Sequence, residues 1–508
     1  MSSFPWLTLL IVIPAVGSFL TAILPGSAEF AKRFAFGVSL VTLGVGAAAA
    51  SQFDRGSSAQ FQLAEQHAWI PQFGVSYSLG VDGIALILIL MSLVLTPVCL
   101  LAAWHDVQDE GDGGRRVKAY YGLLLSLVPF IVGVFAATDV FLFYILFEAM
   151  LVPIYFLIGR FGGPRRQYAS MKFLLFGLAG GLVMLVAVIA LYLQGPGGAD
   201  GFLIAKLTGL SIDPTTERLL WVGFFIAFAI KAPMVPVHTW LPDAATEATP
   251  ATATLLVGVL DKVGTFGMIR FCLQLFPEAN AWATPVVVVL AVISIMYGAL
   301  LAIGQTDMMR LIAFTSVSHF GFIVLGIFAL TNTSTVGASL YMLNHGFGTA
   351  GLFLFAAMFI RRRGSKRIPD FGGWQRVTPG IAGAFLIAGL STLALPGLSS
   401  FVSEFLVMVG AFGVFPAATV IACLVIILAS MYILLWYKRV MTGPKPEGLS
   451  HIKDWSVREK WVAAPLLGFF VVFGLFPKPA LDVLNPAVDH TLSYVQAHPA
   501  TLAEGSTK

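Results

Sequence analysis

Seven ionisable side chains interrupt long apolar stretches of this chain, and each stands alone near the middle of its own stretch. They are two glutamates, three lysines and two histidines: Glu148, Lys172, Lys231, Lys262, His319, His345 and Glu404. A charge at the centre of a bilayer costs at least ~2.5 kcal/mol, so such residues are rare and typically mark a path for protons or ions. The pattern predicts a series of proton-relay stations.

Hydroxyl groups accompany the histidines at helical spacing. Thr315 and Ser316 precede His319 by four and three residues, which places all three on one helix face. We expect these hydroxyls to hold water between titrating groups. Ligation of a haem by His319 and His345 on neighbouring helices is the rival use of this pair. Their position among other buried charges favours hydration and proton relay.

Two apolar stretches contain breaks beside these charges. After Lys231, Pro233 and Pro236 remove the amide partners of the carbonyls of Ala229 and Ala232, which predicts two bare acceptors for an ammonium. His238 follows this first break and is a supporting candidate. Paired broken helices at membrane depth are typical of transport sites, because irregular backbone there must line protein or water.

The second break is centred on Pro396 and Gly397. Ser399 or Ser400 is expected to cap a new half-helix that holds Glu404 in its first turns. The positive end of a helix dipole favours a carboxylate there.

The composition requires membrane-spanning helices to position these residues. The chain is 58% hydrophobic and 11% charged, with a mean hydropathy of +0.87. We find about fourteen apolar runs of roughly 20 residues, the length that crosses a bilayer. The predicted fold class is therefore an all-α polytopic membrane protein in which two helices are broken. Counted from the N-terminus, these are helix 7, centred near residue 229, and helix 12, centred near residue 388. The first run has no basic residue before Lys32 and is expected to be a retained helix, not a signal peptide.

The positions of the two breaks indicate an inverted repeat of two five-helix units. Helix 7 then corresponds to helix 12, so that Lys231 and Glu404 occupy equivalent positions in the two repeats. By the same alignment, Glu148 is equivalent to His319, and Lys172 is equivalent to His345. The expected divisions are an N-terminal three-helix segment, the first repeat, the second repeat, and a C-terminal helix with its tail: 1–117, 118–275, 276–441 and 442–508.

Lys and Arg are distributed unevenly over the predicted loops. Odd-numbered loops carry 21 and even-numbered loops with the tails carry 6. The positive-inside rule places the odd loops in the cytoplasm and both termini, including Lys508, outside a bacterial-type inner membrane. The basic run 361–367 is expected to be part of this anchor, with nucleic acid or a specific lipid as the less favoured interpretations.

Several functions are excluded by what the sequence lacks. Cys99, Cys272 and Cys423 are isolated, which argues against an iron–sulfur cluster. Neither a Gly-rich dinucleotide motif nor a phosphate-binding loop is present. We expect this chain itself to hold no cofactor and no metal.

Three motifs together carry a family resemblance. They are the run from Lys231-Ala232-Pro233 through His238-Thr239-Trp240-Leu241-Pro242-Asp243-Ala244, the pair Asp261-Lys262, and Leu395-Pro396-Gly397 followed by Ser403-Glu404-Phe405. The chain resembles the antiporter-like proton-channel subunits of NADH-quinone oxidoreductase (respiratory complex I). Glu404 favours the M-type chains, since the L-type and N-type chains usually carry Lys at that position.

The resemblance implies roles for the buried charges. Glu148 and Lys231 resemble a pair whose contact is made and broken during pumping. Lys262, His319 and His345 match the residues that form a central hydrated axis in such subunits. Glu404 matches the station on the exit side. Lys172 matches a lysine on the sixth helix. The sequence departs from the family at Ala245, where a His is usual, and at Asp261, where an apolar residue is usual.

The implied function is proton movement from cytoplasm to outside, driven by electron transfer in other subunits. Those subunits are expected to hold NADH, FMN, iron–sulfur clusters and quinone, with L-type and N-type chains as neighbours in the lipid bilayer and no nucleic acid. Two alternatives stay open: a subunit of a sodium/proton antiporter or membrane-bound hydrogenase, and a non-conducting scaffold.

Overall fold

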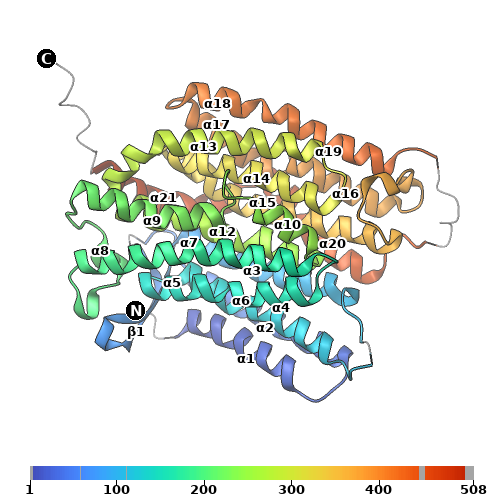
Figure 1. Ribbon diagram of the computed structural model, residues 1–508, viewed down its shortest axis with the longest axis horizontal. Coiled ribbons are helices and arrows are strands. Elements are labelled where there is room, and N and C mark those ends of the chain that lie inside the picture. Colours follow the sequence, from blue (N-terminus) through green and yellow to red (C-terminus); the bar gives the residue numbers. More distant parts are fainter. Residues whose placement is uncertain (1–3, 58, 110, 445–451, 498–508) are drawn as a thin grey trace.

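The computed structural model describes residues 4–57, 59–109, 111–444 and 452–497. Most helices lie side by side along one direction, from α1 at one flank to α18 at the other (Figure 1). The α-helices are α1 (Trp6–Ile23), α2 (Ala28–Ser51), α3 (Gly83–Ala102), α4 (Arg115–Ala136), α5 (Val140–Ala149), α6 (Leu151–Phe161), α7 (Arg166–Gln194), α8 (Ile204–Leu207), α9 (Pro214–Lys231), α10 (Trp240–Glu247), α11 (Pro250–Leu255), α12 (Lys262–Gly267), α13 (Pro277–Ile303), α14 (Met308–Phe328), α15 (Asn332–Arg363), α16 (Pro379–Thr392), α17 (Ser399–Phe412), α18 (Pro416–Cys423), α19 (Val425–Met441), α20 (Val457–Leu475) and α21 (Lys478–Ala497).

The membrane character predicted from composition is confirmed. Ten helical spans among the described residues are long and apolar enough to cross a membrane, or up to eleven if the pair α20–α21, bent by 71°, is one span. Three further apolar stretches are interrupted: α9 with α10, Pro250–Leu273, and α16 with α17. The fourteen crossings and the inverted repeat stay predictions. So do the four divisions of the chain, the second of which would begin inside α4.

A two-stranded antiparallel sheet joins α2 to α3. Strands β1 (Gln62–Ile70) and β2 (Val75–Val81) pair Glu65 with Leu79. The Glu65 carboxylate accepts a hydrogen bond from the backbone N–H of Leu7 at 2.7 Å, so the strand holds the first turn of α1. Figure 1 shows β1 at the end of the bundle where both termini are marked.

Helices α14 and α15 form the centre of the bundle. All of the apolar window of α14 and 94% of that of α15 are buried, against 33% for α1 and 28% for α2. Polar side chains on helices that are enclosed in this way need other protein groups as hydrogen-bond partners. Polar residues on α14 and α15 therefore face other helices and not lipid.

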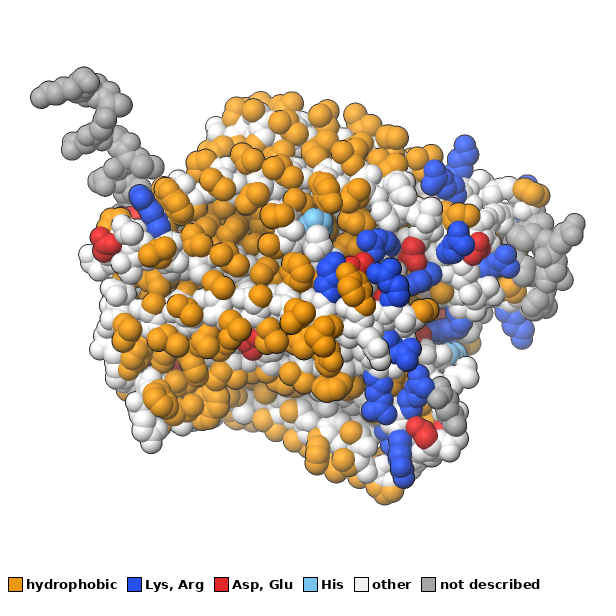
Figure 2. All heavy atoms as spheres, viewed as in Figure 1, with side chains coloured by type: hydrophobic (Ala, Val, Ile, Leu, Met, Phe, Trp, Pro, Cys, Tyr) orange, Lys and Arg blue, Asp and Glu red, His pale blue; other side chains and the backbone are white. Residues whose placement is uncertain are grey.

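Hydrophobic side chains cover most of the face shown in Figure 2, and Lys and Arg gather at one end of it. On the face shown in Figure 2, most blue side chains lie at the end opposite the marked termini. This separation is the one expected from the loop counts. Which end faces the cytoplasm stays a prediction, and Lys445 and Lys508 of that count lie outside the described residues.

Both predicted helix breaks are confirmed, but two details of them were wrong. The carbonyl of Ala229 is not bare, because the chain turns after α9 so that the N–H of Met234 donates to it at 3.0 Å. No serine side chain caps α17: Leu398 is the N-cap residue. The Ser399 hydroxyl instead lies 3.1 Å from that of Ser391, across the break.

Candidate functional site

Buried polar side chains from six helices meet in the centre of the bundle. They come from the helical stretch Pro250–Leu273 and from α9, α14, α15, α17 and α19: Lys231, Asp261, Lys262, His319, Tyr341, His345, Glu404 and Tyr432. Each is at most 6% exposed. Five of the seven ionisable residues singled out in the sequence belong to this cluster.

Lys262 is the most enclosed of the seven predicted stations, with no exposed surface. Its Nζ donates to the carbonyl of Val257 at 2.7 Å and lies 2.6 Å from Nδ1 of His345. The ring centroid of Phe320 is 5.0 Å from the same Nζ. A π-helical turn, Leu256–Leu260, precedes Lys262 and presents the Val257 carbonyl to it.

His345 continues the series on α15. When Lys262 is an ammonium, Nδ1 of His345 accepts from it, and a neutral His345 then carries its proton on Nε2, which lies 3.2 Å from the Thr349 hydroxyl. The ring of His319 is 5.3 Å away, centroid to centroid. Nε2 of His319 in turn lies 3.3 Å from the Tyr432 hydroxyl of α19. These contacts give both nitrogens of His345 and Nε2 of His319 a protein partner, which favours relay over haem ligation.

Glu404 joins the cluster through a tyrosine. The Tyr341 hydroxyl donates to Oε1 of Glu404 at 2.7 Å, and the Tyr341 ring lies 5.9 Å from the His319 ring. Tyr341, His345 and Thr349 recur every four residues and therefore share one face of α15. That face links the central histidines with the carboxylate on α17.

Lys231 and Glu148 make no ion pair with each other among the described residues. Nζ of Lys231 has no hydrogen-bond partner and lies 5.6 Å from the ring centroid of Phe147 and 5.5 Å from that of Phe173. Oε1 of Glu148 is also without a partner. Its carboxylate fills the space beside Gly181 on α7, where an added Cβ would lie 1.7 Å from Oε1.

Lys172 lies apart from the central cluster. It stands in the second turn of α7, and its Nζ is 2.8 Å from Oδ2 of Asp243. Arg310 binds the other oxygen of the same carboxylate at 2.7 Å. Lys172 was expected at mid-depth in the membrane. The structure places it instead near the start of α7, in an ion-pair group beside α10 and α14.

Of the predicted supporting residues, the prolines lie in the two helix breaks, and His238 is buried just after the first one. Pro233 and Pro236 lie in the turn between α9 and α10, and Pro396 in the break before α17. His238 is buried, with Nδ1 unpartnered and its ring 5.2 Å from Tyr297.

Thr315 and Ser316 bond to their own helix, and the water expected between their hydroxyls and titrating groups stays a prediction. Both hydroxyls donate to the carbonyl of Ile312 in their own helix, at 2.8 and 3.1 Å. Tyr432 was missed, because an aromatic residue in an apolar run gives no signal. Tyr341 was visible only as a residue four positions before His345.

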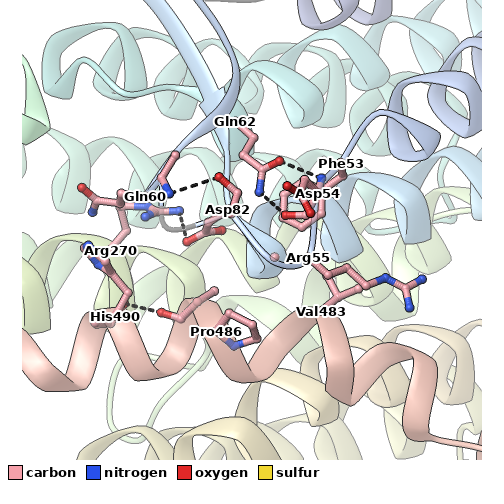
Figure 3. A pocket seen from close by; sticks show the side chains of 15 residues that line it. Phe53, Asp54, Arg55, Gln60, Gln62, Asp82, Arg270, Val483, Pro486 and His490 are labelled. Carbon is pink, nitrogen blue, oxygen red and sulfur yellow. Dashed lines mark hydrogen bonds and ion pairs between the residues drawn. The ribbon is translucent and has the colours of Figure 1, made fainter.

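A separate cavity of about 310 Å³ opens at the end of the bundle that carries the sheet (Figure 3). Its walls include Asp54, Gln62 and the middle of α21 around His490. The ion pair between Arg270 and Asp82 closes one side at 2.7 Å, with side chains only 4% and 8% exposed. None of the predicted relay residues lines this cavity.

We expect Arg270→Met to destabilise the protein by about 3–5 kcal/mol, because it leaves the Asp82 carboxylate buried without its partner. The thermal denaturation midpoint of the purified complex measures this loss. Adding Asp82→Asn to Arg270→Met should restore part of it. Lys478→Met removes an exposed pair with Asp482 and serves as the control, with little change expected. An equal effect of the two single changes would contradict the role of burial.

Comparisons with known proteins show which chains this one is similar to. The family model described as NADH:quinone oxidoreductase/Mrp antiporter, transmembrane, matches residues 137–430. The chain is 47% identical to NADH-quinone oxidoreductase subunit M of Mycobacterium tuberculosis, over 98% of this chain and 96% of that protein. It is 36% identical to the subunit M of Pseudomonas aeruginosa, over 98% and 99% of the two chains.

Solved structures show the same arrangement of helices. A chain of respiratory complex I from Thermus thermophilus with bound NADH matches with a TM-score of 0.86 at 29% identity, over 96% of this chain and 99% of that one. A chain of the Mrp complex from Dietzia sp. matches with a TM-score of 0.84 at 22% identity, over 98% and 99%. The second similarity concerns the fold alone.

Proposed function

This chain belongs to the family of antiporter-like membrane subunits of NADH-quinone oxidoreductase and Mrp antiporters, and from that premise we propose that it carries protons across the membrane. The resemblance seen in the sequence, to M-type subunits, is confirmed by the subunit M relatives. The proposed direction is from cytoplasm to outside, with both termini outside a bacterial inner membrane.

The observation that supports proton transfer is the chain of contacts from Lys262 to Glu404 along the buried helices α14 and α15. Lys262 touches His345, the two histidine rings are neighbours, and Tyr341 joins them to the carboxylate of Glu404. Each group can give or accept a proton at a defined atom. A scaffold would not need titratable groups in this order.

The chemistry of each contact suggests its step. An ammonium at Lys262 can pass a proton to Nδ1 of His345, and His345 can then release one from Nε2. Glu404 is proposed as the last station of the series, where a proton leaves for the outside. Glu148 and Lys231 are proposed to form their contact transiently, since Nζ of Lys231 lies beside the ring of Phe147, the residue before Glu148, while Nζ of Lys231 and Oε1 of Glu148 are unpartnered.

The driving force and partners follow from the relatives and are part of the proposal. NADH-quinone oxidoreductase activity belongs to the named relatives as complexes, so electron transfer is proposed to occur in other subunits with NADH, FMN, iron–sulfur clusters and quinone. L-type and N-type chains are the proposed neighbours. The low identity to the Mrp chain gives the antiporter alternative no support beyond the fold.

Replacing Lys231 by Ala is the direct test of the proposed function. Proton uptake or release by proteoliposomes that contain the purified complex, followed with an internal pH dye during NADH oxidation, should fall by about tenfold or more, in the range of a lost general acid–base group. Glu148→Ala should behave alike. Electron transfer from NADH to a soluble acceptor is the control and should be unchanged.

The swap Glu148→Lys with Lys231→Glu separates transport from scaffolding. A scaffold that needs only opposite charges should keep wild-type function when the pair is reversed, whereas a relay with ordered stations should not. Wild-type pumping by both single alanine variants, with assembly verified, would remove the pair from the proposed function.

A further inference from the structure

Asp261 is a buried carboxylate that none of the steps above uses. It has no exposed surface, and neither of its oxygens has a hydrogen-bond partner among the described residues. Lys262 follows it directly but turns toward Val257 and His345 instead. A buried carboxylate without hydrogen bonds is costly to keep, so its position calls for an explanation.

The packing of α12 against α9 places Asp261 at the first helix break. A Cβ added at Gly264 would lie 2.5 Å from the backbone N of Ala232, and one at Gly267 would lie 2.4 Å from the Phe228 ring. The glycine face of α12 is therefore in direct contact with the last turn of α9. Asp261 precedes Gly264 by three residues, so it shares this face one turn nearer the break.

This position lies between two lysines. Gly264, three residues after Asp261, packs against Ala232, the residue that follows Lys231, and Lys262 follows Asp261 directly. On the other side, Nζ of Lys231 lies 5.6 Å from the ring of Phe147, the residue before Glu148. The titratable groups around the break thus alternate in sign, from Glu148 through Lys231 and Asp261 to Lys262. Two ammonium groups side by side would repel each other, whereas a carboxylate between them attracts both.

We propose that Asp261 is a proton-transfer station that connects Lys231 with Lys262 and so joins the Glu148 side of the bundle to the central histidines. This inference rests on the proposed function and adds a residue to it. No other carboxylate among the described residues of the central cluster stands between the two lysines.

The proton balance of the two steps is simple. The ammonium of Lys231 gives one proton to the Asp261 carboxylate, which leaves a neutral amine and a neutral carboxylic acid. Asp261 then gives that proton to a neutral Lys262, which restores the carboxylate and forms the Lys262 ammonium. Each transfer converts an ion pair into a neutral pair or the reverse, so no isolated charge is formed in the apolar interior.

The test is Asp261→Asn in the complete, purified complex. Since Asp261 makes no hydrogen bond, its replacement leaves no buried partner unsatisfied, and assembly should be retained. We expect proton pumping in proteoliposomes to fall by about tenfold or more, with NADH oxidation by a soluble acceptor unchanged. Asp261→Leu, apolar and of comparable size, serves if the Asn variant does not assemble.

Two measurements separate relay from structural support. Asp261→Glu keeps a titratable carboxyl and should retain part of the pumping, and formate added to Asp261→Ala should restore some of it by supplying a small acid. Glu217→Gln is the matched control, because Glu217 is a buried carboxylate that accepts from two backbone amides far from the lysines. It should pump normally.

The outcomes are distinct. Wild-type pumping by Asp261→Asn, or failure of both Glu and formate to restore any pumping, would overturn the station at Asp261. Loss of pumping in Lys231→Ala alongside normal pumping in Asp261→Asn would reject Asp261 and leave the proposed function in place. Normal pumping in both variants would reject the proposed function itself.

Discussion

Lys262→Arg should pump protons nearly as poorly as Lys262→Ala, although Arg keeps the positive charge. A guanidinium is protonated under all conditions in proteins, so it can hold the contacts of Lys262 with Val257 and His345 but cannot release a proton. We expect pumping to fall by at least about tenfold in both variants. The measurement is the internal pH change of proteoliposomes per NADH oxidised.

Lys262 has no exposed surface, so the bulkier Arg can also disturb packing. Lys262→Met, close in length and uncharged, controls for volume and should assemble and pump as poorly as Lys262→Ala. Rescue by Arg would show that Lys262 acts only as a fixed counter-charge, and this result would refute its role as a station.

Glu404→Gln is the second change with a large expected effect. Gln retains an oxygen that accepts the hydrogen bond from Tyr341, which is 2.7 Å long in the structure, but it cannot bind and release a proton. The complex should assemble normally while its proton output falls by about tenfold or more. Glu404→Asp should retain part of the activity, since the carboxyl is preserved one methylene shorter.

Glu65→Gln is the matched control for this experiment. Glu65 is also a buried carboxylate, but it holds the N–H of Leu7 at the sheet and lies outside the central cluster. Its replacement should leave pumping unchanged. Tyr341→Phe, which removes only the hydroxyl, should reduce pumping less than Glu404→Gln. Wild-type proton output from Glu404→Gln would exclude Glu404 as the last station.

The broad fold and the central charges were predictable because their signals are local. A charge in a 20-residue apolar run is visible without any knowledge of its neighbours, and the helix breaks after Lys231 and around Pro396 follow from the covalent geometry of proline and glycine. The identity of Lys262, His345 and Glu404 as a group also followed from such local evidence, helped by the family resemblance.

The contacts were not predictable, because they join residues far apart in the chain. Lys262 and His345 are separated by 83 positions, and Tyr432 and His319 by 113. The pairing of Lys172 with Asp243 likewise depends on how α7 packs on α10. A hydroxyl such as that of Thr315 can donate to a carbonyl of its own helix instead of to a water or a titrating group. Residue spacing alone does not show which of these acceptors it takes.

The π-helical turn before Lys262 also limits how the length of this segment can change. A π turn contains one residue more than an α turn, and here the N–H of Asp261 reaches the carbonyl of Leu256, five positions back. Deleting any one residue of Leu256–Leu260 would let the backbone relax into an ordinary α-helix. The carbonyl of Val257 would then accept from the backbone N–H four positions on, as in any α-helix, in place of the Lys262 ammonium. Lineages that lose a residue here would keep a spanning helix but deprive Lys262 of this acceptor, so chain length in this segment is constrained as strictly as residue type.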